Sequence, residues 1–229
     1  VTPYGLSDKP LAMGMISTRT DAAGRYHLEG LPKEGAKGYA LTILPPLDRP
    51  YFMRSDDLIV PPSPGVAPTT FDIALRRGIW IEGRVVDGKS GKPVSALVNY
   101  YPMLSNPHAK GRPEFRPNVG SVPWQDRYPT DDDGHFRVPG LPGEGVVTAR
   151  CTAPAAYRIG AGAEGIAHAP DGRNLLATYD RINPDLYNTL RAVDIPEETE
   201  TFSCDLGFNP ARSIVVRAVD ETGKPISDV

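Results

Sequence analysis

Hydrophobic and polar residues alternate with a period of two in several short segments of the chain. This pattern predicts β-strands with one buried face, because successive side chains of a strand point to opposite sides. In residues 147–151, the odd-numbered positions are expected to face the core, and Thr148 and Arg150 the solvent. Short strands separated by turn-forming residues predict an all-β protein in which two sheets pack as a sandwich. The predicted strands are residues 79–87, 96–101, 135–138, 147–151 and 202–206.

Three sequence patterns occur twice, in the same order along the chain. The longest is Thr-Asp-Ala-Ala-Gly-Arg-Tyr-His-Leu-Glu-Gly-Leu-Pro, which begins at Thr20 and recurs in related form from Thr130. Ordered repetition predicts tandem structural units, and their length, well beyond that of a solenoid repeat, predicts a separate core for each. The three matching pairs are residues 20–32 with 130–142, 71–75 with 202–206, and 84–94 with 217–226.

The repeats divide the chain into three parts. Residues 1–78 are expected to form a partial sandwich without its first strand, and residues 79–211 a sandwich with two long insertions. The insertions cover 102–129 and 155–196, and loops of that length are usually functional or disordered. Residues 212–229 are expected to be the truncated start of a third unit, a strand and turn too short to bury a core. We therefore expect the chain to be a segment of a longer protein.

Composition excludes several classes of function. The formal net charge of −3 argues against a general nucleic-acid-binding protein, which is usually basic. No run of about 18 apolar residues is present, so we expect no membrane span. Two cysteines are too few for a disulfide scaffold or a four-cysteine zinc site.

The repeated motifs resemble those of the carboxypeptidase regulatory-like domain. They comprise a strand that ends in Val86-Asp87, the Gly-Lys-Pro-Val turn of residues 91–94, and the Thr-Asp-x-x-Gly-x-aromatic motif at 20–26 and 130–136. The resemblance implies tandem transthyretin-like or Ig-like β-sandwich units with long inserted loops. Members of this family occur in exported and surface proteins of bacteria, and as accessory domains beside peptidases. The resemblance therefore implies a non-catalytic, exported module without a cofactor, acting as a structural spacer or partner-binding domain.

The motif residues themselves have structural roles in this interpretation. Asp21 and Asp131 are expected to accept backbone hydrogen bonds in their own turns, and Gly24 and Gly134 to adopt a positive φ. The carboxylates of residues 131–133 are of the kind that bind calcium, but the first copy of the turn lacks the extra carboxylates. We expect an ordinary acidic turn and no metal site.

Sequence signatures of an enzyme are missing. Intradiol dioxygenases share the turn motif and hold iron with two histidines one residue apart, but this chain contains no His-x-His. It also contains no Gly-x-Ser-x-Gly and no His-Glu-x-x-His. We expect no catalytic residue. The four histidines, which are far apart in sequence, are His27, His108, His135 and His168.

The first insertion is the best candidate for a ligand-binding loop, because aromatic rings stack on sugars and arginines hold carboxylates or hydroxyls. Two interpretations are open: the aromatic residues attach the loop to its own sandwich, or they bind a carbohydrate. We favour attachment, and a row of exposed aromatic rings would favour carbohydrate binding. The expected partners are therefore other domains of the same chain and a protein or glycan ligand. The candidate residues are Tyr101, Arg112, Phe115, Arg116, Trp124 and Tyr128.

Both cysteines lie at positions predicted to be buried. Cys151 and Cys204 take the places of isoleucines in the first repeat, on strands expected to be neighbours in one core. They are predicted to be either free thiols that pack as small apolar residues, or a disulfide as suits an exported protein. A Cα separation above about 7 Å would exclude the bond.

Overall fold

Within the residues that the computed structural model describes, the fold is all-β, with one short 3-10 helix, η4 (Ala163–Gly165). The described residues are 2–5, 16–30, 39–58, 68, 70–111, 128–152, 157–166, 186–212 and 217–227. Within them, no helix is long and apolar enough to cross a membrane. The strands are β1 (Thr2–Gly5), β2 (Tyr39–Ile43), β3 (Arg54–Leu58), β4 (Ile79–Asp87), β5 (Ala96–Pro102), β6 (Tyr128–Pro129), β7 (His135–Gly140), β8 (Gly143–Cys151), β9 (Thr189–Ile195), β10 (Thr201–Ser203) and β11 (Leu206–Phe208).

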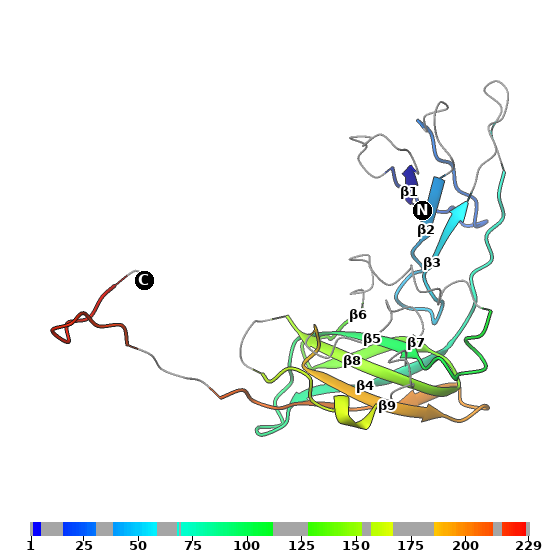
Figure 1. Cartoon of the computed structure of the whole chain (residues 1–229). Coiled ribbons are helices and arrows are strands. Elements are labelled where there is room, and N and C mark those ends of the chain that lie inside the picture. The colour runs from blue at the N-terminus through cyan, green and yellow to red at the C-terminus, as the bar shows by residue number, and fades with distance from the viewer. Residues whose placement is uncertain are drawn as a thin grey trace.

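Two four-stranded sheets pack around the main core (Figure 1). In the mixed sheet, β4 pairs antiparallel with β7 on one side and parallel with β10 and then β11 on the other. The second sheet is antiparallel, in the order β6-β5-β8-β9. The core unites both sheets and includes Ile81, Val85 and Val138 from the first and Val98 and Val147 from the second. The open sheets and shared core are consistent with a β-sandwich.

β8 is buried on both faces, which corrects the expected outward position of Thr148. Its odd-numbered residues face the main core, but Val146 belongs to a second apolar cluster with Leu190 and Ile166. Ile166, directly after η4, packs with Val146 on this face, and Thr148 is fully buried. Its Oγ1 has no hydrogen-bond partner among the described residues. Arg150, as expected, is exposed.

A separate three-stranded sheet lies towards the N-terminus (Figure 1). Its strands β1, β2 and β3 are antiparallel with β2 in the centre, the same order as β5, β8 and β9 in the sandwich. It joins the sandwich through a small apolar cluster in which Phe52 packs with Ala109 and Leu141. Backbone hydrogen bonds also pair residues 50–52 with 76–78, directly before β4.

Residues 217–227 form a turn outside all three sheets. Val219 forms an isolated β-bridge with Pro225, as Val86 does with Pro93 at the end of β4. The apolar side chains of Val219 and Ile226 are 45% and 44% exposed. This turn therefore has the local geometry of the β4 turn without a core beneath it.

Candidate functional site

Three turns of sequence Asp-x-x-Gly-x have the same hydrogen bonds, at Asp21, Asp131 and Asp220. One carboxylate oxygen of each aspartate accepts the N–H groups of the residues two and four positions later, at 2.8–3.0 Å. The aspartate N–H donates to the carbonyl of the residue four positions later, and the glycine N–H donates to the aspartate carbonyl. The glycines have φ of 76°, 80° and 83°, which only glycine adopts without strain. The turn structure predicted for Asp21 and Asp131 is confirmed.

These hydrogen bonds lower the pKa of all three carboxyl groups, because they stabilise the charged form. For Asp21 and Asp131 the largest cause is the backbone N–H four residues later. For Asp220 it is the hydroxyl group of Thr222. Each carboxylate therefore stabilises the backbone of its own turn by accepting hydrogen bonds.

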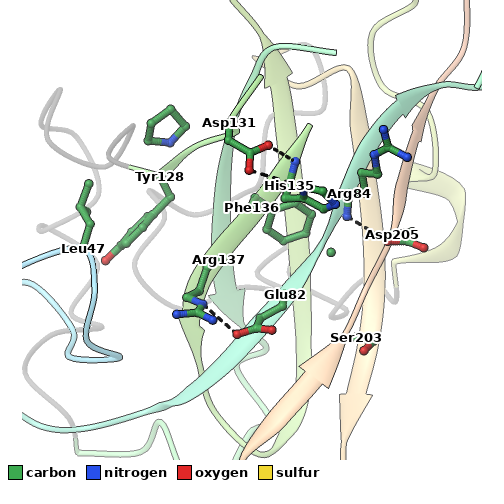
Figure 2. Close-up of a pocket in the computed structure, with 12 residues that line it drawn as sticks. Leu47, Glu82, Arg84, Tyr128, Asp131, His135, Phe136, Arg137, Ser203 and Asp205 are labelled. Carbon is green, nitrogen blue, oxygen red and sulfur yellow. Dashed lines mark hydrogen bonds and ion pairs between the residues drawn. The ribbon is translucent and has the colours of Figure 1, made fainter. Parts of the chain in front are cut away.

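The outer face of the mixed sheet is hollowed beside the Asp131 turn (Figure 2). The hollow has a volume of about 760 Å³ and is open to solvent. Side chains of β4, β7 and the β10–β11 edge line it, with Leu47 and Tyr128 on one side. The polar side chains that the strands present here are Glu82, Arg84, His135, Arg137, Ser203 and Asp205.

Charged groups in this hollow are largely paired with one another. Arg137 Nε lies 2.8 Å from Glu82 Oε1, and its guanidinium lies over the Trp80 ring at 5.0 Å from the centroid. Arg84 donates from Nε to the Asp133 carbonyl at 2.6 Å, and its backbone N–H donates to Asp205 Oδ1 at 2.9 Å. The site is therefore a polar surface with three carboxylates and two guanidinium groups, those of Glu82, Asp131, Asp205, Arg84 and Arg137.

A second hollow lies where residues 76–78 lead into β4. Trp80 lines it together with His108, whose Nε2 lies 2.7 Å from Glu197 Oε1. Arg77 and Glu200 add charged groups of opposite sign. An aromatic ring beside several hydrogen-bonding groups is a combination that can hold a sugar.

Two of the predicted ligand-loop residues, Tyr101 and Tyr128, lie in the described part of the chain, and they belong to different apolar clusters. Tyr101 is 5% exposed, and its hydroxyl lies 2.8 Å from that of Tyr187 within the second apolar cluster. Tyr128 packs partly against the main core and lines the first hollow. Both tyrosines are strand residues of the sandwich itself, Tyr101 on β5 and Tyr128 on β6. The remaining predicted residues lie outside the described part of the chain: Arg112, Phe115, Arg116 and Trp124.

The two cysteines are free thiols in the structure. Cys204 is 1% exposed in the main core, and burial raises its pKa to about 11. Cys151 is partly buried against the same core. Their strands are not neighbours, since β8 and the β10–β11 edge belong to opposite sheets. The predicted shared core is therefore present, whereas the predicted strand adjacency and the disulfide alternative are wrong.

The described histidines each lie beside a carboxylate: His27 by Glu29, His108 by Glu197 and His135 by Asp131. His168 lies outside the described residues. Within the described part, no group of three or more histidine, cysteine or acidic residues is placed to hold a metal ion.

Sequence reasoning selected Tyr128 of the first hollow and missed the other residues that line the two hollows. The polar alternation of Glu82 and Arg84 on one strand, and of His135 and Arg137 on another, was a signal for a polar outer face. Comparisons of the chain with protein-family models, with curated proteins and with solved structures found no match.

Proposed function

We propose that the chain is a non-catalytic β-sandwich module of a larger exported bacterial protein, acting as a structural spacer or partner-binding domain. In this proposal it consists of tandem transthyretin-like units with inserted loops, as the motif resemblance to the carboxypeptidase regulatory-like domain implies. Its partners are other domains of the same protein and a protein ligand.

The observation that carries this proposal is the repeated aspartate turn. The same four hydrogen bonds occur around Asp21 and Asp131, which hold equivalent positions in the first two predicted units, and around Asp220, which holds the position of Asp87 in the third. The motif carboxylates accept hydrogen bonds from backbone amides of their own turns, and this supports a structural role. Tandem repetition of one such element is typical of spacer modules.

Carbohydrate binding is the second candidate function, and Trp80 favours it. The ring is partly exposed between the two hollows, close to hydrogen-bonding groups of His108, Glu197 and Arg137. The Arg137 guanidinium, however, already lies over the Trp80 ring, where a sugar would have to stack. The spacer and partner-binding function is therefore the better supported of the two.

A glycan array distinguishes these candidates. The chain and its Trp80→Ala variant should both give only background binding if the module is a spacer or binds a protein. A glycan that binds the chain but does not bind the Trp80→Ala variant would contradict the proposal and establish carbohydrate binding. Circular dichroism of the variant would check that its β-sheet content is unchanged.

A further inference from the structure

The side chain of Arg84 is held in one orientation where it lines the first hollow. Its Nε donates to the Asp133 carbonyl oxygen at 2.6 Å, and its backbone N–H donates to Asp205 Oδ1 at 2.9 Å. A planar guanidinium that is fixed at Nε presents the N–H groups of its two Nη atoms as a fork in a defined direction. Within the described part of the chain, neither Nη atom makes a hydrogen bond or an ion pair. Arg84 therefore offers an oriented, open guanidinium edge.

The other arginine of this hollow, Arg137, is already paired. Its Nε lies 2.8 Å from Glu82 Oε1, and its guanidinium lies over the Trp80 ring. The Arg84 guanidinium, by contrast, has no carboxylate partner among the described residues, because Asp205 accepts the backbone N–H of Arg84 instead. The two Nη groups of an arginine match the two oxygens of a carboxylate, so an open guanidinium edge favours a carboxylate ligand.

Further polar groups of the hollow are available to such a ligand. His135 lies directly opposite Arg84 in the register of β4 with β7. Its Nδ1 lies 3.4 Å from Asp131 Oδ2, and its Nε2 has no hydrogen-bond partner in the part of the chain that the structure describes. The Ser203 hydroxyl also has no partner there. These groups can hydrogen-bond the amide groups of a ligand that is larger than a carboxylate.

The size and the far side of the hollow indicate what else the ligand carries. The hollow has a volume of about 760 Å³, which is in the range of pockets that hold molecules much larger than a single carboxylate. Figure 2 shows Arg84 and Asp205 at one side of it and Leu47 and Tyr128 at the other. The Leu47 side chain is 46% exposed. A ligand that fills the hollow therefore combines a carboxylate, hydrogen-bonding groups and an apolar part, as a polypeptide segment does.

We propose that the first hollow binds an acidic segment of a partner polypeptide, whose carboxylate pairs with the Arg84 guanidinium and whose apolar neighbour packs on Leu47 and Tyr128. The carboxylate comes from an aspartate or glutamate side chain or from the carboxyl terminus of the partner. This inference names the partner chemistry for the partner-binding part of the proposed function and rests on it.

Nuclear magnetic resonance with small probes tests the pairing. N-acetylglutamic acid α-amide carries a side-chain carboxylate, N-acetyl-leucine carries a terminal one, and N-acetylglutamine α-amide and N-acetyl-leucine amide are their neutral counterparts. Each is added to the full chain at up to about 20 mM, because so small a contact gives millimolar affinity. At least one acid should shift the Nε–Hε signal of Arg84, and the neutral probes should not. Absence of a shift with both acids, or an equal shift with sodium chloride at the same ionic strength, would overturn the proposal.

Variants of charged residues locate the binding. Arg84→Gln should weaken the binding of the acid at least about tenfold, because a charge-assisted pair is lost. Arg158→Gln makes the same change of charge at an exposed arginine outside the hollow and should bind as the unchanged chain does. Asp205→Asn removes a repelling charge beside Arg84 and should tighten binding about twofold. Equal binding by Arg84→Gln and the unchanged chain would overturn the proposal.

Two further measurements keep the test interpretable. Hydrogen exchange in β8 reports whether each variant keeps its sandwich, and Arg84→Lys, which keeps the charge but loses the fork, should bind more weakly than the unchanged chain. Sodium glucuronate is the probe for an acidic sugar, and tighter binding of glucuronate than of both acids would overturn the polypeptide assignment. Failure of every probe would overturn this inference and leave the spacer role standing, whereas glycan binding that is lost in Trp80→Ala would contradict the proposed function itself.

Discussion

At the scale of single residues, the aspartate turns link the sequence motif to acid stability. The pKa of Asp131 is lowered below its ordinary value of 3.8, so the folded chain binds this proton more weakly than the unfolded chain. Such a carboxylate stabilises the fold above about pH 4, and this contribution is lost as the pH falls through the lowered pKa. The Asp21 and Asp220 turns should contribute to stability with the same pH dependence, since the pKa values of their carboxyl groups are lowered as well.

Asp131→Asn should therefore reduce the loss of thermal stability between pH 5 and about pH 2. Asparagine keeps an acceptor oxygen for the turn but removes the charge. Asp132→Asn is the matched control, because the Asp132 carboxylate accepts no hydrogen bond within the described part of the chain. Melting temperatures across this pH range measure the effect. The same pH dependence in both variants would contradict the role given to Asp131.

The buried thiol of Cys204 should be inert in the folded protein. The thiolate is the reactive form, and at pH 8 a group with a pKa of about 11 is almost entirely protonated. Titration with Ellman's reagent at pH 8 should therefore detect at most one thiol, that of Cys151, and two after denaturation. The Cys151→Ser variant should give no native signal. A rapid native reaction in that variant would contradict the burial of Cys204.

At the scale of strands, the sequence pattern located β4 correctly and β5 to within one residue at its end. β8 begins at Gly143, four residues earlier than the alternation predicted, because glycines weaken a strand pattern. Here a glycine is needed, since a Cβ at Gly145 would collide with the Tyr100 ring. The sequence patterns did not predict the parallel pairing of β10 with β4, because this pairing joins segments about 120 residues apart in the chain.

Gly83 is where β4 approaches the β10–β11 edge most closely. A Cβ there would collide with the backbone carbonyl oxygen of Cys204, which cannot move without disturbing the pairing of two strands. Gly83→Ala should therefore lower the free energy of unfolding by about 1–3 kcal/mol, as overpacking usually does. Gly207→Ala on β11 is the control, because its Cβ would contact no atom within 4 Å, and it should be neutral or slightly stabilising. Urea denaturation compares the two, and equal stability would contradict the close approach.

At the scale of the whole molecule, the hollows depend on contacts that local patterns do not reveal. The first hollow combines Glu82, His135 and Ser203, which adjoin only after three separate strands have paired. The second needs Trp80 beside Glu197, which come from β4 and the turn after β9. Sequence reasoning selected a loop rich in aromatic residues instead, because composition is visible locally and strand pairing is not.

In the described part of the chain, an apolar junction joins the N-terminal sheet to the sandwich. Phe52 is 7% exposed and packs with Ala109 and Leu141 of the sandwich. The Gly78 N–H donates to the Pro50 carbonyl at 2.6 Å, which fixes the chain just before β4. The junction therefore combines apolar packing with backbone pairing.

Phe52→Ala should loosen this junction while the sandwich stays folded. Removing a buried phenylalanine side chain costs about 3–5 kcal/mol, and here the loss falls on the contact between the two parts. Small-angle X-ray scattering should give a larger radius of gyration for the variant, and hydrogen exchange in β2 should accelerate while that in β8 does not change. Leu47→Ala is the matched control, because Leu47 is 46% exposed and should change neither quantity. An unchanged radius of gyration in Phe52→Ala would show that backbone pairing between residues 50–52 and 76–78 is enough to hold the two parts in place.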